Sequence, residues 1–117
     1  MGMFDYVDIN YDMPTPKDAT QEQEICIKNT IAADNFQTQD LHCVLDVFYI
    51  DKNGYMYQKN GDEYKQYYVH QHVECYTSIE ILSENLKYWL SYDIKFTDGK
   101  IQQVTINEWR PLVKGKL

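Results

Sequence analysis

The sequence lacks the motifs by which most catalytic and cofactor-binding chains are recognised. Its five glycines form no glycine-rich loop that could approach a phosphate. The serines Ser78, Ser83 and Ser91 lie in no nucleophile-elbow context. The sequence therefore carries no catalytic signature. It favours a non-enzymatic protein without a cofactor, with an enzyme left as an open alternative.

Cysteine is scarce, and no long apolar run is present. The three cysteines, Cys26, Cys43 and Cys75, are an odd number without C-x-x-C spacing. There is no charged-then-apolar leader and no apolar stretch near ~18 residues. These absences predict reduced thiols, a cytoplasmic chain and no membrane segment. Cys43 and Cys75 fall on apolar positions of alternating runs, which predicts that both side chains are buried.

Basic residues are few, and the charge is uneven along the chain. The net charge is −7, and residues 1–51 hold ten acidic residues against two lysines. This excess argues against direct binding to nucleic-acid phosphates, which require a basic footprint. It permits docking on a basic protein surface, for which Asp5, Asp8 and Asp12 are candidate contacts. The simpler interpretation is a solubilising charge that serves no partner, and we favour it.

Turn signals divide the sequence into short runs rich in Tyr, Val, Ile and Phe. Asn53-Gly54, Asn60-Gly61 and Asp98-Gly99 each tolerate the positive φ of a tight hairpin. We expect one mainly β domain over residues 1–117, with about six or seven strands and at most one short helix. The sheet should be antiparallel and built of hairpins as a meander, with a sandwich or an open barrel as alternatives. The last strand should end at Pro111, leaving residues 111–117 as a frayed tail.

Alternation of side chains predicts the individual strands of the first half. Residues 4–9 and 41–50 are β-prone, and the second run is the clearest strand of the chain. One face of that run carries Leu41, Cys43, Leu45, Val47 and Tyr49. Residues 24–28 are ambiguous, and the alternation of Ile25 with Ile27 favours a short strand there over a helix.

The second half predicts two more strands and a hairpin. One strand runs from Tyr64 or Lys65 to Tyr76, and a short separate strand covers residues 77–82. In the first strand of the hairpin, one face carries Tyr88, Leu90, Tyr92, Ile94 and Phe96. A phase change near Gln102-Gln103 in the returning strand predicts a β-bulge.

A candidate metal site lies in the segment His70-Gln71-His72-Val73-Glu74. Residues two apart in a strand share a face about 7 Å apart, so His70 and His72 could hold one transition metal. Glu74, or His42 from another strand, would complete three ligands of an open site. The simpler interpretation is the polar outer face of a half-exposed strand, and we favour it.

The chain is rich in tyrosine, which suits a binding surface. Eleven tyrosines are present, and several fall in the predicted hairpins. Tyr and Trp dominate interface hot spots, so we expect one sheet face or edge to be covered by a protein partner or a second copy. The candidate contacts are Tyr55, Tyr57, Tyr68 and Trp89. A sandwich or barrel that buries both sets of aromatic residues is an equally good alternative.

Several segments together resemble a group of uncharacterised small proteins of bacteriophages and prophages. These proteins open with Met-Gly-Met-Phe-Asp, as residues 1–5 do here, and carry a segment similar to Phe36-Gln37-Thr38-Gln39-Asp40-Leu41. Their hairpins resemble the segments at 49–57 and 92–101. The resemblance covers about half of the chain and assigns no catalytic residue. It implies a phage-encoded accessory protein in the bacterial host cytoplasm.

Composition and resemblance together favour a non-enzymatic factor that binds a host or phage protein. The partner could be a host protein such as a component of a defence system. Two other classes stay open: a small metal-dependent enzyme using His70 and His72, and a structural virion component.

Overall fold

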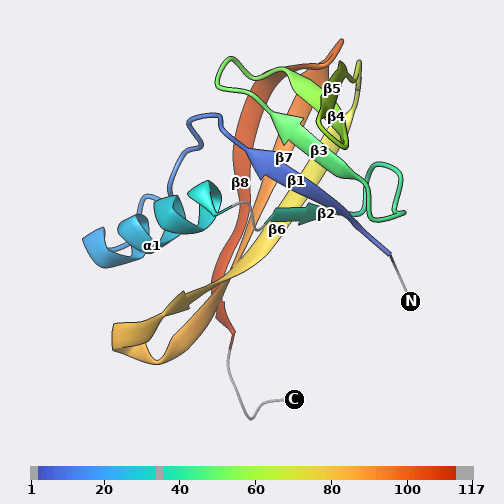
Figure 1. The fold of residues 1–117 in the computed structure, drawn as a ribbon. Helices are drawn as coiled ribbons and strands as arrows, with labels where there is room; N and C mark the ends of the chain where they lie inside the picture. The colour runs from blue at the N-terminus through green and yellow to red at the C-terminus, as the bar shows by residue number, and fades with distance from the viewer. Residues whose placement is uncertain (1–2, 34–35, 113–117) are drawn as a thin grey trace.

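The computed structural model describes residues 3–33 and 36–112. These residues form one eight-stranded sheet with a helix against it (Figure 1). In chain order the elements are β1 (Asp5–Ile9), α1 (Gln21–Ala32), β2 (Phe36–Thr38), β3 (Val47–Ile50), β4 (Met56–Asn60), β5 (Glu63–Gln66), β6 (His72–Ile81), the 3₁₀ helix η1 (Leu82–Glu84), β7 (Leu86–Thr97) and β8 (Lys100–Leu112). The predicted mainly β fold with one short α-helix is confirmed, although the sheet has more strands than expected.

Two three-stranded meanders make up the sheet, and β1 and β2 join them. The strand order is β5-β4-β3-β1-β2-β6-β7-β8. Strand β1 runs antiparallel to β2 but parallel to β3, a pairing that hairpins alone do not predict. The sheet curls until the β3–β4 turn meets the β7–β8 turn, where the Ile101 amide donates to the Gly54 carbonyl over 2.8 Å. An isolated bridge between Tyr55 and Lys100 lies at the same place.

The three glycine turns lie where the sequence predicts them. Gly54, Gly61 and Gly99 have φ values of 91°, 65° and 82°, and each lies within the turn between two paired antiparallel strands. The predicted bulge is also confirmed, because the pairing of β7 with β8 shifts between Lys95 and Phe96, opposite Gln102. A second shift between Ser91 and Tyr92 leaves Asn107 as an extra residue in β8.

The strand expected at residues 24–28 is wrong, because these residues belong to α1. Thr20 caps the helix: its hydroxyl accepts from the Gln23 amide (3.1 Å), and the Gln23 side chain accepts from the Thr20 amide (2.9 Å). This reciprocal capping box favours a helix start more strongly than two isoleucines favour a strand. Only Ile27 of the pair is buried, and Ile25 is 54% exposed.

The strand expected at residues 41–50 is wrong over residues 41–46. Only Val47–Ile50 forms a strand, and its buried side chains are Phe48 and Ile50. Residues 39–46 form a loop whose amides bond to a side chain instead of a neighbouring strand. Cys43 is consequently half-buried, whereas the prediction of a buried Cys75 is confirmed.

The remaining boundaries differ in three places. The strand expected from residue 64 to 76 is interrupted between Gln66 and His72, and β6 then continues without a break through residues 77–81. Strand β8 continues past the expected stop, because Pro111 pairs with Tyr88. Proline is tolerated on an edge strand, where its missing N–H can face away from the sheet. Residues 113–117 of the predicted tail lie outside the described residues.

The core fills the inner face of the curled sheet, where α1 packs against β1 and β6. Its largest fully buried side chains include Phe36, Phe48, Tyr92 and Phe96. Tyr92 donates its hydroxyl to the Pro14 carbonyl over 2.6 Å, and burial raises the pKa of this phenol. Among the described residues, no helix has the length and apolarity needed to cross a membrane.

Candidate functional site

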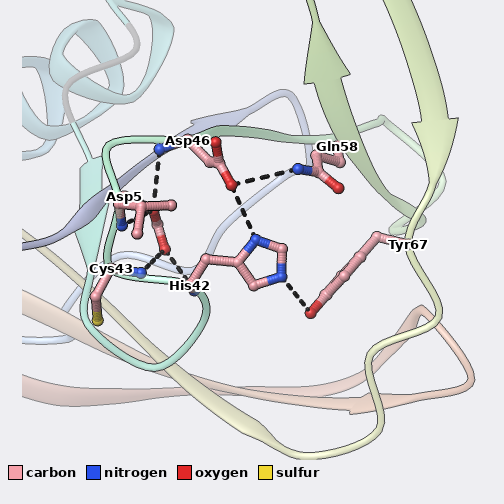
Figure 2. Close-up of polar contacts among 7 residues, drawn as sticks. Asp5, His42, Cys43, Asp46, Gln58 and Tyr67 are labelled. Carbon is pink, nitrogen blue, oxygen red and sulfur yellow. Dashed lines mark hydrogen bonds and ion pairs between the residues drawn. The ribbon is translucent and has the colours of Figure 1, made fainter.

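A buried carboxylate at the start of β1 organises the loop at residues 39–46. The side chain of Asp5 is fully buried and accepts hydrogen bonds from four backbone amides (Figure 2). Its Oδ2 accepts from His42 and Cys43 over 2.7 Å each, and its Oδ1 accepts from Val44 over 3.1 Å and from Asp46 over 3.0 Å. We call residues 39–46 the Asp5-anchored loop.

The amides keep the Asp5 carboxylate ionised. Burial by itself raises the pKa of Asp5, but the four backbone donors outweigh burial and hold the pKa below its ordinary value of 3.8. Hydrogen bonds to a charged acceptor are the stronger class and are each worth about 1.5–3 kcal/mol. Asp5 is therefore an internal structural group, and the expectation that it contacts a partner is wrong.

The Asp5-anchored loop has a strained backbone. Cys43 and Leu45 have φ values of 59° and 62°, in the left-handed region that glycine favours. Each such residue costs about 1–2 kcal/mol relative to a right-handed conformation. The Leu45 amide also donates to the Phe4 carbonyl over 2.9 Å, so the loop is tied to β1 by backbone as well as by Asp5. Strain of this kind persists only where the surroundings over-determine the conformation.

A second set of contacts holds the loop against the core. His42 Nδ1 lies 2.9 Å from Asp46 Oδ2, and His42 Nε2 lies 3.1 Å from the Tyr67 hydroxyl (Figure 2). An ionised Asp46 can only accept, so a neutral His42 carries its proton on Nδ1 and accepts from Tyr67 at Nε2. The His42 ring also packs edge-on against Phe48 and Tyr67, with centroid distances of 5.3 Å and 5.4 Å. Gln58 donates to the same Asp46 oxygen over 3.3 Å.

A series of hydrogen-bonding contacts runs from the Tyr67 hydroxyl through the His42 imidazole to the Asp46 carboxylate. Acid–base relays have the same order of groups. The neighbouring thiol takes no part, because Cys43 Sγ bonds to the Gln39 carbonyl over 3.1 Å and points away from the imidazole in Figure 2. The observed geometry thus accounts for the position of the loop rather than for the activation of a nucleophile.

The loop presents apolar side chains to solvent beside the first residues of the described chain. Val44 is 57% exposed and Leu45 is 48% exposed. On the segment whose backbone is hydrogen-bonded to the loop, Met3 is 49% exposed and Tyr6 is 39% exposed, and the Tyr6 amide donates to the Asp46 carbonyl. We call these four residues, Met3, Tyr6, Val44 and Leu45, the apolar patch. Sequence alternation missed it, because it assigned Val44 and Leu45 to strand faces.

Among the described residues, the acidic side chains of the first half do not form one surface. Asp8 is half-buried in β1, and Asp12 is exposed. Glu22 accepts from Ser83 at one end of β7 over 2.6 Å, whereas Asp51 lies in the β3–β4 turn that meets the opposite end of the β7–β8 hairpin. The uneven charge of the sequence is therefore spread over both ends of the sheet.

The predicted metal ligands turn toward separate partners. His70 lies in the loop before β6, where its Nδ1 accepts from the Asp98 amide over 3.3 Å. His72 Nδ1 lies 2.8 Å from Asp93 Oδ2, and Glu74 accepts from the Ser91 hydroxyl over 2.6 Å. Within residues 3–33 and 36–112, no three His, Cys, Asp or Glu side chains are arranged to hold a metal ion.

All four predicted aromatic contacts have partners within the chain. Tyr55 lies under the Lys100 ammonium, whose Nζ is 5.3 Å from the ring centroid. Tyr57 donates to Asp51 over 3.3 Å, and burial together with that carboxylate raises the pKa of its hydroxyl. Trp89 stacks on Tyr76 with a centroid distance of 5.2 Å. Tyr68 donates its hydroxyl to Gln66 Oε1 over 3.2 Å, but its side chain is 68% exposed and is the most exposed of the four.

Comparison with protein-family models, with curated proteins and with solved structures finds no match to this chain.

Proposed function

We propose that the chain is a non-enzymatic protein-binding factor and that the apolar patch is its main contact surface. One observation carries the proposal. Asp5 anchors a loop in which Cys43 and Leu45 have strained conformations, and this loop leaves Val44 57% and Leu45 48% exposed. Burying these side chains would serve stability better than exposing them. A strained loop that displays aliphatic groups is typical of a binding element.

The anchoring favours binding because the loop is ordered before a partner arrives. Ordering a mobile loop on binding costs about 0.5–1.5 kcal/mol for each immobilised side chain. Here the amides of His42, Cys43, Val44 and Asp46 are already fixed by Asp5. Within the apolar patch, Tyr6 supplies the aromatic ring, which packs edge-on against Phe4 with ring centroids 5.2 Å apart. Aromatic residues with aliphatic neighbours are frequent hot spots.

The resemblance to phage proteins supports a setting for this function. We propose that the chain is phage-encoded and acts in the cytoplasm of a bacterial host. Its partner would be a host protein, such as a component of a defence system, or another phage protein. A role in the virion is the second candidate, and the presence of the chain in purified particles would distinguish it.

The test is affinity capture with paired variants. A tagged full-length chain is used to capture partners from bacterial lysate, which mass spectrometry identifies. The double variant Val44→Ser/Leu45→Ser removes the exposed aliphatic groups, and Leu82→Ser is the matched control, because Leu82 is 80% exposed on η1. With the partner then purified, titration calorimetry should show at least about a tenfold loss of affinity for the double variant and less than about twofold for the control.

A different result would contradict the proposal. If the purified partner binds the double variant as tightly as the unmodified chain, the apolar patch is not the contact surface. The far-ultraviolet circular dichroism of both variants should match the unmodified chain, since exposed substitutions usually change stability by less than about 0.5 kcal/mol.

A further inference from the structure

The sheet has one short, charged edge and one long, open edge. Strand β5 forms the first edge with four residues, and Glu63 and Lys65 lie on it. Strand β8 forms the other edge with thirteen residues, paired on one side with β7. Among residues 3–33 and 36–112, backbone partners on its outer side are found only for its first residues, where Ile101 bonds to Gly54 and Lys100 bridges to Tyr55. Short length and charge protect an edge from pairing with another strand, and β8 has neither over its middle.

The register shows which backbone groups of β8 point outward. The Ile101 amide points away from β7, because it donates to Gly54. Residues whose N–H and C=O groups point outward alternate with residues whose groups point toward the paired strand. Each bulge inserts one extra residue and so shifts this alternation by one position. After the bulges at Gln102 and Asn107, the outward positions are therefore Val104, Ile106, Trp109 and Pro111. Proline fits this assignment, because it has no N–H to offer.

These outward groups lack a backbone partner within the described residues. The hydrogen bonds outside the regular strand ladders include none from the amides of Val104, Ile106 or Trp109. The side chains of the same three residues are half-buried against the core from the edge of the sheet. A strand laid along β8 would satisfy the amides and cover the exposed remainder of these side chains.

The sequence of this edge is suited to strand pairing. Residues 101–107 read Ile-Gln-Gln-Val-Thr-Ile-Asn and contain no charge, proline or glycine. Segments of this kind on an exposed edge are templates for another strand. Charged residues begin again only at Lys100 on one side and at Glu108 and Arg110 on the other.

We propose that β8 pairs antiparallel with β8 of a second copy of this chain, which joins the two sheets into one. A two-fold axis between Asn107 and Glu108 places Ile106 opposite Trp109 of the second copy, and both are outward positions. Thr105 then lies opposite Arg110, and Glu108 lies opposite Asn107. No like charges face each other in this register, so the net charge of −7 does not oppose the local pairing. The interface does not depend on the apolar patch.

The first experiment measures the mass of the full-length chain by sedimentation equilibrium from micromolar concentration to about 1 mM. A dimer whose population rises with concentration is expected, because association follows mass action. A chain that stays monomeric over the whole range overturns the proposal.

The second experiment places the dimer at β8 with two lysine variants. Thr105 is exposed, and Thr105→Lys would set a lysine opposite Arg110 of the second copy twice per dimer. Within its own chain this lysine faces Asp93, which favours folding. The dimer dissociation constant should rise by at least about fivefold. Ser78→Lys is the matched control, since Ser78 is exposed on the interior strand β6, and it should leave the constant unchanged. Equal dissociation constants for both variants would overturn the assignment to β8.

Discussion

The Asp5-anchored loop and the Asp98-Gly99 turn both bend the chain through positive φ angles, but by different means. The turn uses Asp98 at 50° and Gly99 at 82°, residue types that tolerate the left-handed region. The loop places Cys43 and Leu45 at 59° and 62°, where neither residue type is favoured. Nearest neighbours specify the turn, whereas the loop depends on a carboxylate 37 to 41 residues earlier in the chain.

The turn and the loop differ in what holds their backbone: local residue types in the turn, and a distant carboxylate in the loop. The residue types of the turn tolerate its φ angles by themselves, although Val69, Met56 and His70 also bond to the turn. A loop stabilised from a distance can be held in a conformation that its own sequence disfavours, and the side chains it displays are then chosen for another purpose. We expect the two regions to respond in different ways when their constraints are removed.

The largest effect is expected from Asp5→Ala. Four amides lose a charged acceptor in a buried site, which should lower the free energy of unfolding by about 3–5 kcal/mol. Urea unfolding followed by circular dichroism measures the change. Asp12→Ala is the matched control on an exposed acid and should cost less than about 0.5 kcal/mol. A loss below about 1 kcal/mol for Asp5→Ala would show that the carboxylate does not hold the loop.

The second-largest loss of stability is expected from Gly99→Ala, in the Asp98-Gly99 turn. At a φ of 82° an alanine is strained, and its Cβ would lie 2.7 Å from the Tyr67 carbonyl oxygen. The expected loss in unfolding free energy is about 2–3 kcal/mol. Gly61→Ala separates the strain of a positive φ from the clash with Tyr67. Gly61 also has a positive φ, of 65°, but no atom lies within 4 Å of the added Cβ. The control should lose only about 1 kcal/mol, and equal losses would remove the contact with Tyr67 from the explanation.

Acid should weaken the loop before it weakens the turn. The folded-state pKa of Asp5 is lowered, so its contribution is complete above its unfolded pKa and is lost as the pH falls through the folded value. Unfolding free energies measured between about pH 5 and pH 2 should therefore fall more steeply for the unmodified chain than for Asp5→Asn, which cannot ionise. Parallel pH profiles would mean that the amides do not stabilise the ionised carboxylate.

The smallest effect, of opposite sign, is expected at Leu45. Glycine relieves the strain at a φ of 62°, but it also loses more backbone entropy on folding than leucine does. The net result for Leu45→Gly should be a free energy of unfolding that is higher by about 0.5 kcal/mol. Val44→Gly is the neighbouring control, since Val44 is not among the residues with positive φ, and it should lower stability by about 0.5–1 kcal/mol. Thermal unfolding of both variants gives the comparison, and the same sign for both would argue against strain at Leu45.

What the sequence could predict follows the same division between local and remote constraints. The β7–β8 hairpin was predicted with its turn, its bulge and its buried face, because Asp98-Gly99 and the alternation of Tyr92, Ile94 and Phe96 are local signals. The spacing of Thr20 and Gln23 in the sequence also fits a capping box, whereas the alternation of Ile25 with Ile27 favours a strand at the same place. His70 and His72 were placed on one strand face, although β6 begins only at His72.

The candidate site itself could not be predicted from one sequence. Residues 41–46 alternate like a strand, and nothing near them shows that their amides bond to Asp5. Asp5 in turn looked like one more exposed acid in an acidic half. Only the parallel pairing of β1 with β3 brings the two segments together, and that pairing has no local signal.

Amide hydrogen exchange tests the central claim most directly, because it reports on the loop and the hairpin in one sample. In the unmodified chain, the amides of His42, Cys43, Val44 and Asp46 should exchange slowly, although they lie in a loop. In Asp5→Asn these four amides should lose most of their protection, while those of β7 and β8 that are bonded to one another keep theirs. Loop amides that exchange at the rate of an unfolded peptide in the unmodified chain, or that are equally protected in Asp5→Asn, would contradict the account.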